Sequence, residues 1–129
     1  EYDYYTTTKG VLEKVKAHVG DVDFAVQPEL VSLLSSRNFG RYADEKGEMK
    51  VCFISNNDIT GGNSGSAMFN SKGELLGLAF DGNWEAMSSD ILYEPKMQRT
   101  IGVDVRYILF MIEKYGKAGN LIQELNILN

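Results

Sequence analysis

The order of the apolar runs predicts a mostly β fold, an antiparallel β-barrel followed by a C-terminal α-helix. About five or six strand-like runs follow one another, and the strongest helical pattern appears only near the end. Strands that are not separated by helices pair as antiparallel neighbours, which favours a small barrel. With 129 residues, of which 43% are hydrophobic, the chain is about one domain long and can bury a core. We therefore predict a single domain over residues 1–129.

Strand-like runs occupy much of the chain before residue 106. The opening EYDYYTTTKGVL is rich in Tyr and Thr and predicts a strand broken at Gly10. The segment Asn70-Ser71-Lys72-Gly73 is a turn sequence, so the runs on either side of it should form a hairpin. The remaining predicted strands, with the two of the hairpin, cover 51–55, 66–70, 74–80 and 99–105.

Two helices and one short helical turn are also predicted. Pro28 opens the run PELVSLLSS, whose apolar residues recur at helical spacing. A polar, glycine-containing loop over 38–50 follows it. The C-terminal helix begins at Val105 and stops at Gly116, and a further helical turn covers 120–128. One face of this C-terminal helix is apolar: Val105, Ile108, Leu109, Ile112 and Tyr115.

Composition and residue counts exclude several classes of function. The formal net charge of −5 argues against nucleic acid as the main partner, because phosphate binding requires a basic face. No apolar run reaches the roughly 18 residues of a membrane-spanning helix. The single cysteine, Cys52, cannot form an internal disulfide, and we interpret it as a buried small hydrophobic residue. Together with the single histidine, His18, it makes no zinc-binding pattern.

The segment DITGGNSGSAMFN, residues 58–70, is the strongest candidate for chemistry. One interpretation is a glycine-rich hairpin loop in which Ser64 has no catalytic role. The Gly-x-Ser-x-Gly elbow of α/β-hydrolases does not fit, because Ser66 takes the last glycine position and a strand follows instead of a helix. The Gly-x-Ser-Gly loop of trypsin-like proteases does fit. In such a loop Ser64 is the nucleophile, the Gly62 and Ser64 amides form an oxyanion hole, and Gly65 leaves room for the attacked carbonyl.

The segment FDGNWE, about twenty residues after Ser64, is the expected substrate wall of a trypsin-like barrel. Gly82 would leave the mouth of the pocket open, and Asp81 beside it could hold a positive group of the substrate. The alternative is structural, since Asp-Gly is also an ordinary turn sequence and Trp84 could belong to the core.

Long stretches of the chain closely resemble the C-terminal part of a known family. NDITGGNSGSAMFNSKGELLGLAFDGNWEAMSSDI and QRTIGVDVRYILFMIEKY match most clearly, and YYTTTKGVLEK and NFGRYAD match as well. The family is that of the bacterial dipeptidyl-peptidases 7 and 11, trypsin-like serine exopeptidases of serine peptidase family 46. The resemblance implies the C-terminal, nucleophile-bearing half of a double-barrel protease with a helical insert. It also implies removal of dipeptides from free peptide N-termini in the periplasm or at the surface of a Gram-negative bacterium.

The resemblance also implies roles for individual residues. Ser64 is the nucleophile, the Gly62 amide contributes to the oxyanion hole, and Asp81 helps to anchor the free α-amino group of the substrate. Gly82 matches the position that separates the subfamilies. Arginine there goes with acidic residues before the cleaved bond and glycine with hydrophobic ones, so the chain looks like the dipeptidyl-peptidase 7 type. No metal or organic cofactor is implied.

Two positions depart from simple analogy. Ala67 stands where the family commonly carries proline, a local change on a strand. Asp58 lies six residues before Ser64, which is the spacing of trypsin's specificity acid and would predict Lys or Arg substrates. The resemblance includes this aspartate in members that prefer hydrophobic residues, so Asp58 is not among the predicted specificity residues and the two observations stay in tension.

A serine nucleophile needs a base and an acid that orients the base, and this sequence supplies neither. His18 lies in the polar stretch KAHVGDVD, and we interpret it as a solvated loop residue. The expected partners are therefore the missing N-terminal barrel and helical domain, together with peptide substrates. We expect the chain to be a piece of a longer protein, inactive alone, and able to form a homodimer through exposed apolar faces of its strands and C-terminal helix. The alternative function is a non-catalytic barrel that binds peptides or a partner protein.

Overall fold

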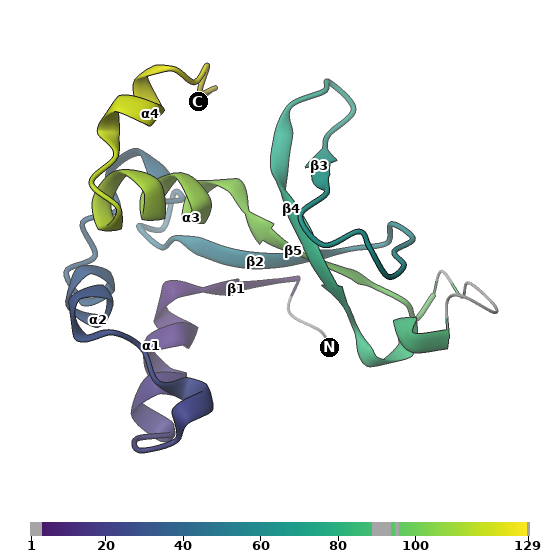
Figure 1. Ribbon diagram of the computed structural model, residues 1–129, viewed down its shortest axis with the longest axis horizontal. Helices are drawn as coiled ribbons and strands as arrows, with labels where there is room; N and C mark the ends of the chain where they lie inside the picture. Colours follow the sequence, from purple (N-terminus) through teal and green to yellow (C-terminus); the bar gives the residue numbers. More distant parts are fainter. Residues whose placement is uncertain (1–3, 89–93, 95, 129) are drawn as a thin grey trace. The chain divides into compact units, whose positions relative to one another are not determined.

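The computed structural model describes residues 4–88, 94 and 96–128, and these residues form two compact units (Figure 1). The first unit comprises Glu1–Thr6 and Val51–Val105, and the second comprises Thr7–Lys50 and Arg106–Asn129. The first unit contains most of the β-sheet, and the second contains most of the helices. The single domain expected over residues 1–129 stays a prediction.

Five strands form one sheet in the described part of the chain, in the order β1-β2-β5-β4-β3. The pairs β2–β5, β5–β4 and β4–β3 are antiparallel, as the sequence predicted. The sheet is open, because the short strands β1 and β3 lie at its two edges without pairing to each other, and a closed barrel is not seen among the described residues. The strands are β1 (Tyr5–Thr7), β2 (Lys50–Ser55), β3 (Ala67–Phe69), β4 (Leu75–Gly82) and β5 (Thr100–Asp104).

The predicted hairpin is confirmed between β3 and β4. The Gly73 amide donates to the Asn70 carbonyl at 3.0 Å, and Gly73 has a φ of +77°. The Asn70 side-chain oxygen accepts from the amides of Lys72 and Glu74 at 2.9 and 3.0 Å. Asparagine and glycine therefore close this turn for the local reasons that made it recognisable in the sequence.

Two glycines allow β4 and β5 to pack closely. A Cβ atom on Gly77 would lie 2.0 Å from the carbonyl oxygen of Val103, and one on Gly102 would lie 2.6 Å from the sulfur of Met68. The Phe53 ring would lie 2.9 Å from either added atom, so this ring covers both glycines. A side chain at position 77 would meet the backbone of β5 and is therefore incompatible with the observed pairing, whereas one at position 102 would require the Met68 and Phe53 side chains to shift.

A β-bulge interrupts the pairing of β4 with β5. Ala79 is opposite Gly102 and Asp81 is opposite Ile101, so Phe80 is the extra residue on β4. Bulges turn the following side chains away from the regular alternation and are frequent next to functional sites. This one immediately precedes Asp81.

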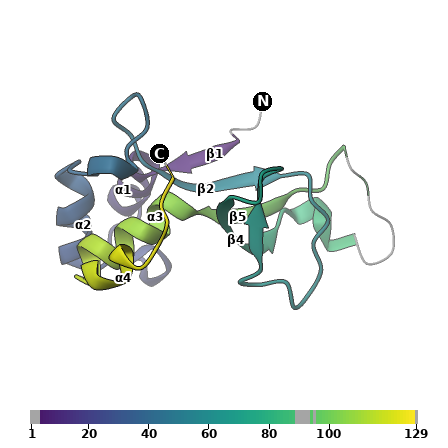
Figure 2. The same ribbon diagram turned by 90° about the horizontal axis from the view of Figure 1, so that it is seen from above.

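The second unit is built from helices that flank two turns. Both predicted helices are confirmed: one begins at Pro28, and the other begins at Val105 and ends before Gly116, its last turn being a π-helix. Figure 2 shows β5 leading directly into this second helix. The helices are α1 (Thr8–Ala17), α2 (Pro28–Ser35), α3 (Val105–Phe110), the π-helical turn η4 (Met111–Tyr115) and α4 (Gly119–Gln123), with 3₁₀ turns η1 (Val22–Phe24), η2 (Gly40–Tyr42) and η3 (Trp84–Ser88).

The start of α1 corrects the prediction of a strand that continues to Gly10. The Thr7 hydroxyl caps the helix by accepting from the Gly10 amide at 3.5 Å. The Thr8 amide donates to the Met49 carbonyl at 3.0 Å, and Thr8 is buried. Threonine favours strands, but it also caps helices well, and here a non-local hydrogen bond fixes where the helix begins.

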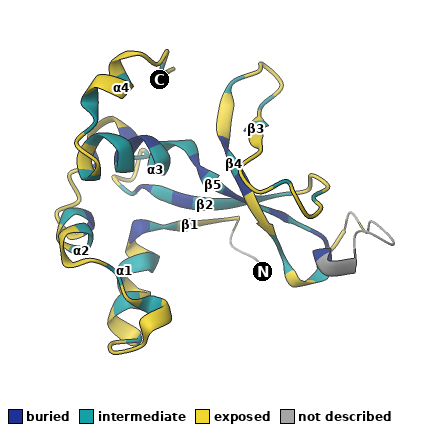
Figure 3. Ribbon diagram, viewed as in Figure 1, coloured by how far each residue is buried: buried dark blue, intermediate teal, exposed yellow. Residues whose placement is uncertain are grey.

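An aromatic cluster forms the core of the second unit. Phe110 on α3 meets Phe39 and Tyr42 edge to face, with ring centroids 5.7 and 6.2 Å apart. Because Leu109 is buried, part of the helix face expected to be exposed is covered. The β3–β4 hairpin carries several exposed apolar residues (Figure 3): Phe69, Leu75, Leu76 and Phe80. Other exposed apolar residues lie elsewhere among the described residues, including Val19 and Val22 in the second unit.

Candidate active site

Two consecutive tight turns precede β3 and carry Ser64. In the first, the Asn63 amide donates to the Thr60 carbonyl at 3.2 Å, and the Thr60 amide donates to Asn63 Oδ1 at 2.9 Å. Gly62, the third residue of this turn, has a φ of +95°. A positive φ at the third position alone identifies a type II turn, which favours glycine there. The backbone conformation therefore accounts for Gly62.

The second turn presents Ser64 at an exposed position. The Ser66 amide donates to the Asn63 carbonyl at 2.9 Å, and Gly65 has a φ of +87°. This is again a type II turn, with Ser64 as its second residue. Asn63 closes the first turn with its side chain and the second with its carbonyl, so it fixes the backbone on which Ser64 stands.

Hydrogen bonds attach this turn to β4 just before the bulge. The Gly65 amide donates to the Ala79 carbonyl at 2.7 Å, and the Ala79 amide donates to the Ser66 carbonyl at 2.9 Å. Asp81 follows Ala79 by two residues, which is about 7 Å along a strand. The fold of the first unit therefore brings the Ser64 turn and the Asp81-Gly82 segment, predicted separately, to one region.

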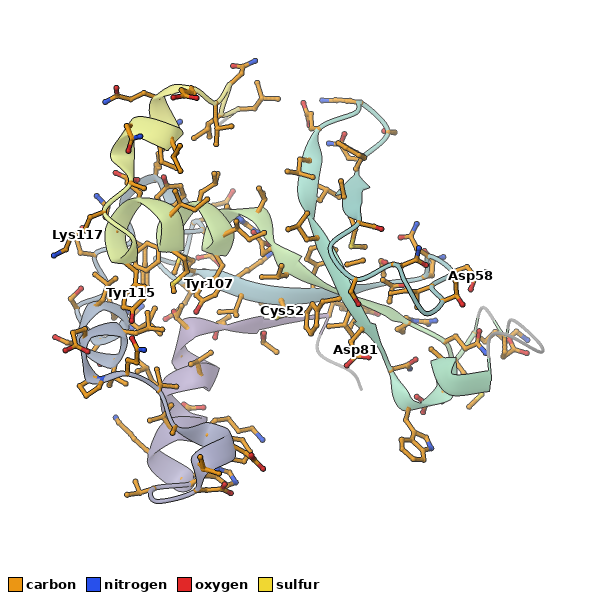
Figure 4. All side chains as sticks on the ribbon, viewed as in Figure 1. Cys52, Asp58, Asp81, Tyr107, Tyr115 and Lys117 are labelled. Atoms are coloured by element: carbon orange, nitrogen blue, oxygen red, sulfur yellow. The ribbon has the colours of Figure 1, made fainter. Side chains whose placement is uncertain are left out.

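Asp81 is exposed, and its carboxylate is held in place locally. Its Oδ1 atom accepts from the Gly82 amide at 2.8 Å, which limits rotation of the side chain. Figure 4 shows Asp81 on β4 and Asp58 on the loop that follows β2. Asp58 is exposed as well.

The space beside Gly82 is filled rather than open. A Cβ atom at this position would lie 2.9 Å from the Cβ atom of Ala86 and 3.5 Å from Cγ2 of Ile59. The first distance is shorter than side chains tolerate, and the second is an ordinary contact. The specificity role expected for Gly82 stays a prediction, but its neighbours are now defined.

Asn83 anchors the 3₁₀ turn η3, which carries Ala86. The Asn83 amide donates to the Arg99 carbonyl at 2.9 Å, and Asn83 Oδ1 accepts from the Arg99 amide at 2.8 Å. Its side-chain nitrogen donates to the Met97 carbonyl at 2.8 Å, and its carbonyl accepts from the Ala86 amide at 2.9 Å. Trp84 on the same turn is 81% exposed, so the alternative that it belongs to the core is wrong for this chain.

His18 and Cys52, the single histidine and cysteine of the chain, lie in surroundings that do not favour a catalytic role. His18 is the C-cap of α1 and lies in the turn that follows the helix, with Nδ1 3.0 Å from the Lys14 carbonyl oxygen and its ring stacked on Phe24. It belongs to the second unit, whereas Ser64 belongs to the first. Cys52 is half-buried on β2 (Figure 4), and burial raises the pKa of its thiol, which disfavours the reactive thiolate.

Among residues 4–88, 94 and 96–128, no group of three or more His, Cys, Asp or Glu side chains could hold a metal ion. No helix in that part of the chain is long and apolar enough to cross a membrane.

The family model of peptidase S46 matches residues 1–127. The chain belongs to the peptidase S46 family. It is 60% identical over 126 residues to dipeptidyl-peptidase 7 of Porphyromonas endodontalis, covering 98% of this chain and 15% of that protein. It is 46% identical over 127 residues to the Asp/Glu-specific dipeptidyl-peptidase of Capnocytophaga gingivalis, covering 98% of this chain and 18% of that protein.

Solved structures of an S46 peptidase have the same fold. DPP11 of Porphyromonas endodontalis in complex with the dipeptide Arg-Glu superposes with a TM-score of 0.90 at 43% identity. The match covers 95% of this chain and 17% of that one. The chain therefore spans about one sixth of the length of the S46 relatives it matches.

In this S46 chain, the residues predicted for the site all lie in the first unit: Gly62, Ser64, Asp81 and Gly82. Sequence reasoning missed the residues that support them, namely Asn63, Asn83 and Ala86. Asn63 was recognisable, because asparagine directly after a pair of glycines is a turn-former. Ala86 gave no local signal, because its contact with position 82 exists only once η3 has folded back.

Proposed function

We propose that this chain is the nucleophile-bearing part of a serine dipeptidyl peptidase that releases dipeptides with a hydrophobic second residue. The observation that carries the proposal is the Ser64 turn, built on two glycines at positive φ and hydrogen-bonded to β4 beside Asp81. Support comes from relatives named dipeptidyl-peptidase 7 that are 60% and 58% identical to this chain. The rest of the protein supplies the catalytic base, its orienting acid and the other half of a trypsin-like barrel pair.

Ser64 acts as an acyl-transfer nucleophile. The base takes the hydroxyl proton as Oγ attacks the carbonyl carbon of the peptide bond after the second residue. The amides of Gly62 and Ser64 donate hydrogen bonds to the resulting oxyanion. The C–N bond then breaks, the base returns the proton to the leaving amine, and water hydrolyses the acyl-enzyme. The dipeptide leaves, and the Ser64 hydroxyl is restored.

Asp81 makes the enzyme an exopeptidase. Its carboxylate, held by the Gly82 amide, pairs with the free α-ammonium group of the substrate. This pairing fixes the distance from the N-terminus to Ser64 and so limits the product to two residues. We propose that the protein acts in the periplasm or at the cell surface, where it would meet peptides.

The experiment uses the protein from the full parent reading frame and dipeptidyl fluorogenic substrates that vary at the second residue. We expect hydrolysis after hydrophobic residues, loss of activity in Ser64→Ala, and a loss in kcat/KM of about tenfold or more in Asp81→Asn. Acetylation of the substrate amine should remove activity as well. The isolated 129-residue chain should show no Ser64-dependent hydrolysis, because it lacks a base at Ser64.

Each outcome separates one part of the proposal from the rest. Activity only after acidic residues would overturn the role of Gly82 and keep the nucleophile. Equal hydrolysis of acetylated substrates would overturn the role of Asp81. Complete inactivity of the full protein would favour the non-catalytic, peptide-binding barrel.

A further inference from the structure

Gly82 lies in a conformation that any residue can adopt. Its φ is outside the left-handed region occupied by Gly62 and Gly65. Backbone strain therefore does not require glycine at position 82, in contrast to the two glycines of the Ser64 turns. What limits this position is space.

The space is limited by one atom. The Cβ atom of Ala86 lies 2.9 Å from where a Cβ atom on residue 82 would stand, whereas the other near neighbours, Ile59 and the Arg99 carbonyl, stand at 3.5 and 3.8 Å. Ala86 is only 8% exposed, so its methyl group is packed in place. Without this methyl group, a Cβ atom on residue 82 would make only contacts of ordinary length.

The Ala86 methyl group cannot easily move away. Asn83 makes three hydrogen bonds of 2.8–2.9 Å to residues 97 and 99, and its carbonyl accepts the Ala86 amide at 2.9 Å. These bonds fix the first turn of η3 against the start of β5. A larger residue at position 82 must therefore break or shift this anchored turn.

We infer that Ala86 is a second specificity-determining residue, which acts by setting how large residue 82 can be. The inference rests on the proposed function, in which residue 82 faces the substrate residue before the cleaved bond. Glycine at 82 with alanine at 86 gives an uncharged site suited to an apolar side chain. A cationic residue at 82, which would pair with an acidic substrate residue, requires a smaller residue at 86.

The contact itself is tested by a stability cycle on the full-length protein. Gly82→Ala should lower Tm by about 2 °C or more, because it overpacks the site. Ala86→Gly will have its own cost, and the double variant should be more stable than the sum of the two effects predicts. If the stability changes of the two single variants simply add in the double variant, positions 82 and 86 are not in contact. This result does not depend on whether the protein is an active peptidase.

Specificity is tested with Gly82→Arg, Ala86→Gly and the double variant on dipeptidyl substrates with a hydrophobic or an acidic second residue. Gly82→Arg alone should lose hydrophobic activity and gain little acidic activity. The double variant should exceed it in kcat/KM on acidic substrates by roughly tenfold, about the rate effect of relieving 1.4 kcal/mol of overpacking. Its activity should also respond to salt as an ion pair does.

Glu85→Gly is the matched control, because it places a glycine in the same turn and leaves the Ala86 methyl group in place. Combined with Gly82→Arg, it should not restore acidic activity. Full acidic activity from Gly82→Arg alone, or equal rescue by Glu85→Gly, would overturn the inference. A wild type that hydrolyses no dipeptide would overturn the proposed function and the specificity role of Ala86, while the stability cycle would still report on the contact.

Discussion

In the proposed function, Asn63 supports the nucleophile Ser64 through the backbone of the two turns that lead to it. Its side chain closes the turn before Ser64, and its carbonyl closes the turn that contains Ser64. Oxyanion stabilisation depends on amides that already point to one place, so in the proposed function the rigidity of this backbone would contribute to the rate. We therefore propose Asn63 as a positioning residue.

Asn63→Ala should lower kcat of the full-length protein by about five- to tenfold and leave KM nearly unchanged. The loss reflects one side chain–backbone hydrogen bond of about 1 kcal/mol, and its effect appears mainly when the oxyanion forms. Steady-state kinetics on the preferred dipeptidyl substrate provide the measurement. Asn120→Ala, at an exposed position on α4, is the control and should leave both constants unchanged. A rise in KM without a change in kcat would assign Asn63 to substrate binding instead.

The Ser64 turn was predictable because its determinants are local. Gly62 and Gly65 occupy backbone conformations that glycine favours, and both residues belong to the motif itself. The Ala86–Gly82 contact was not predictable, because it joins two residues through a turn whose shape depends on bonds from Asn83 to residues 97 and 99. Sequence patterns therefore reveal residues that need a particular backbone conformation, but not residues that are limited by contacts with distant parts of the chain.

Among the elements, the pairing of β4 with β5 depends most on a single residue. An added Cβ atom at Gly77 would lie 2.0 Å from a backbone oxygen of β5, and a strand cannot yield there without losing its hydrogen bonds. Gly77→Ala should therefore destabilise by about 4 kcal/mol or more, which in practice prevents recovery of folded protein. Soluble yield and thermal unfolding of the full-length protein measure this effect.

Gly73→Ala is the comparison for this prediction. Gly73 has a φ of +77° but nothing within 4 Å of an added Cβ atom. Its replacement should cost only about 1 kcal/mol of conformational strain. If both variants lose the same stability, close strand packing is not what Gly77 provides.

The hydrogen bond between Tyr42 and Glu113 ties η2 to η4 in the second unit. The Tyr42 hydroxyl donates to the Glu113 carboxylate at 2.5 Å. Burial and this bond raise the pKa of Tyr42 to about 12. The same bond, with one from Lys114, lowers the pKa of Glu113. The pair is therefore strongest when the tyrosine is neutral and the glutamate is charged.

This pair predicts a pH dependence that Tyr42→Phe should remove. In the unfolded chain tyrosine ionises near its ordinary pKa of 10.0, so the stabilisation is full below pH 10 and is lost as pH rises toward 12. The contribution of Glu113 depends on pH in the opposite direction. Its stabilisation is present above pH 4.5, the ordinary pKa of glutamate, and is lost as the pH falls through the lowered pKa of the folded state.

At neutral pH, Tyr42→Phe should cost about 1.5–3 kcal/mol, the usual range for a hydrogen bond to a charged group. The difference from wild type should shrink above pH 10 and below pH 4.5. Urea unfolding at a series of pH values measures it. A difference that stays constant from pH 7 to pH 11 would show that the bond contributes nothing through ionisation.

The elements were predicted best where their signals were local. Pro28 and Gly116 mark helix ends, and Asn70 and Gly73 mark a turn, so the sequence placed these features correctly. The prediction of a strand up to Gly10 was wrong, because the strand preference of the threonines competes with helix capping by Thr7. Closure of the sheet depends on partners for β1 and β3, which no local pattern specifies.

For the molecule as a whole, the β3–β4 hairpin presents an exposed apolar surface. Phe69 is 60% exposed, Phe80 46%, Leu76 42% and Leu75 41%. The chain spans 15–18% of the length of its curated relatives, and we propose that the remainder of the full-length protein covers this surface. Without that cover, the burial of apolar area favours association of one copy with another.

The isolated 14.4 kDa chain should therefore associate with itself as its concentration rises. Replacement of Phe69 and Leu76 by serine removes two apolar side chains from the hairpin and should shift the equilibrium toward monomer by about 2 kcal/mol or more. Val19 and Val22 are 86% and 83% exposed in the second unit, and their replacement by serine is the matched control, expected to leave the association unchanged.

Sedimentation equilibrium over a wide concentration range gives the masses directly. A mass of 14.4 kDa at the highest concentration would show that the hairpin surface is tolerated in water. Equal weakening by both pairs of substitutions would show that general hydrophobicity, rather than the hairpin, holds the copies together.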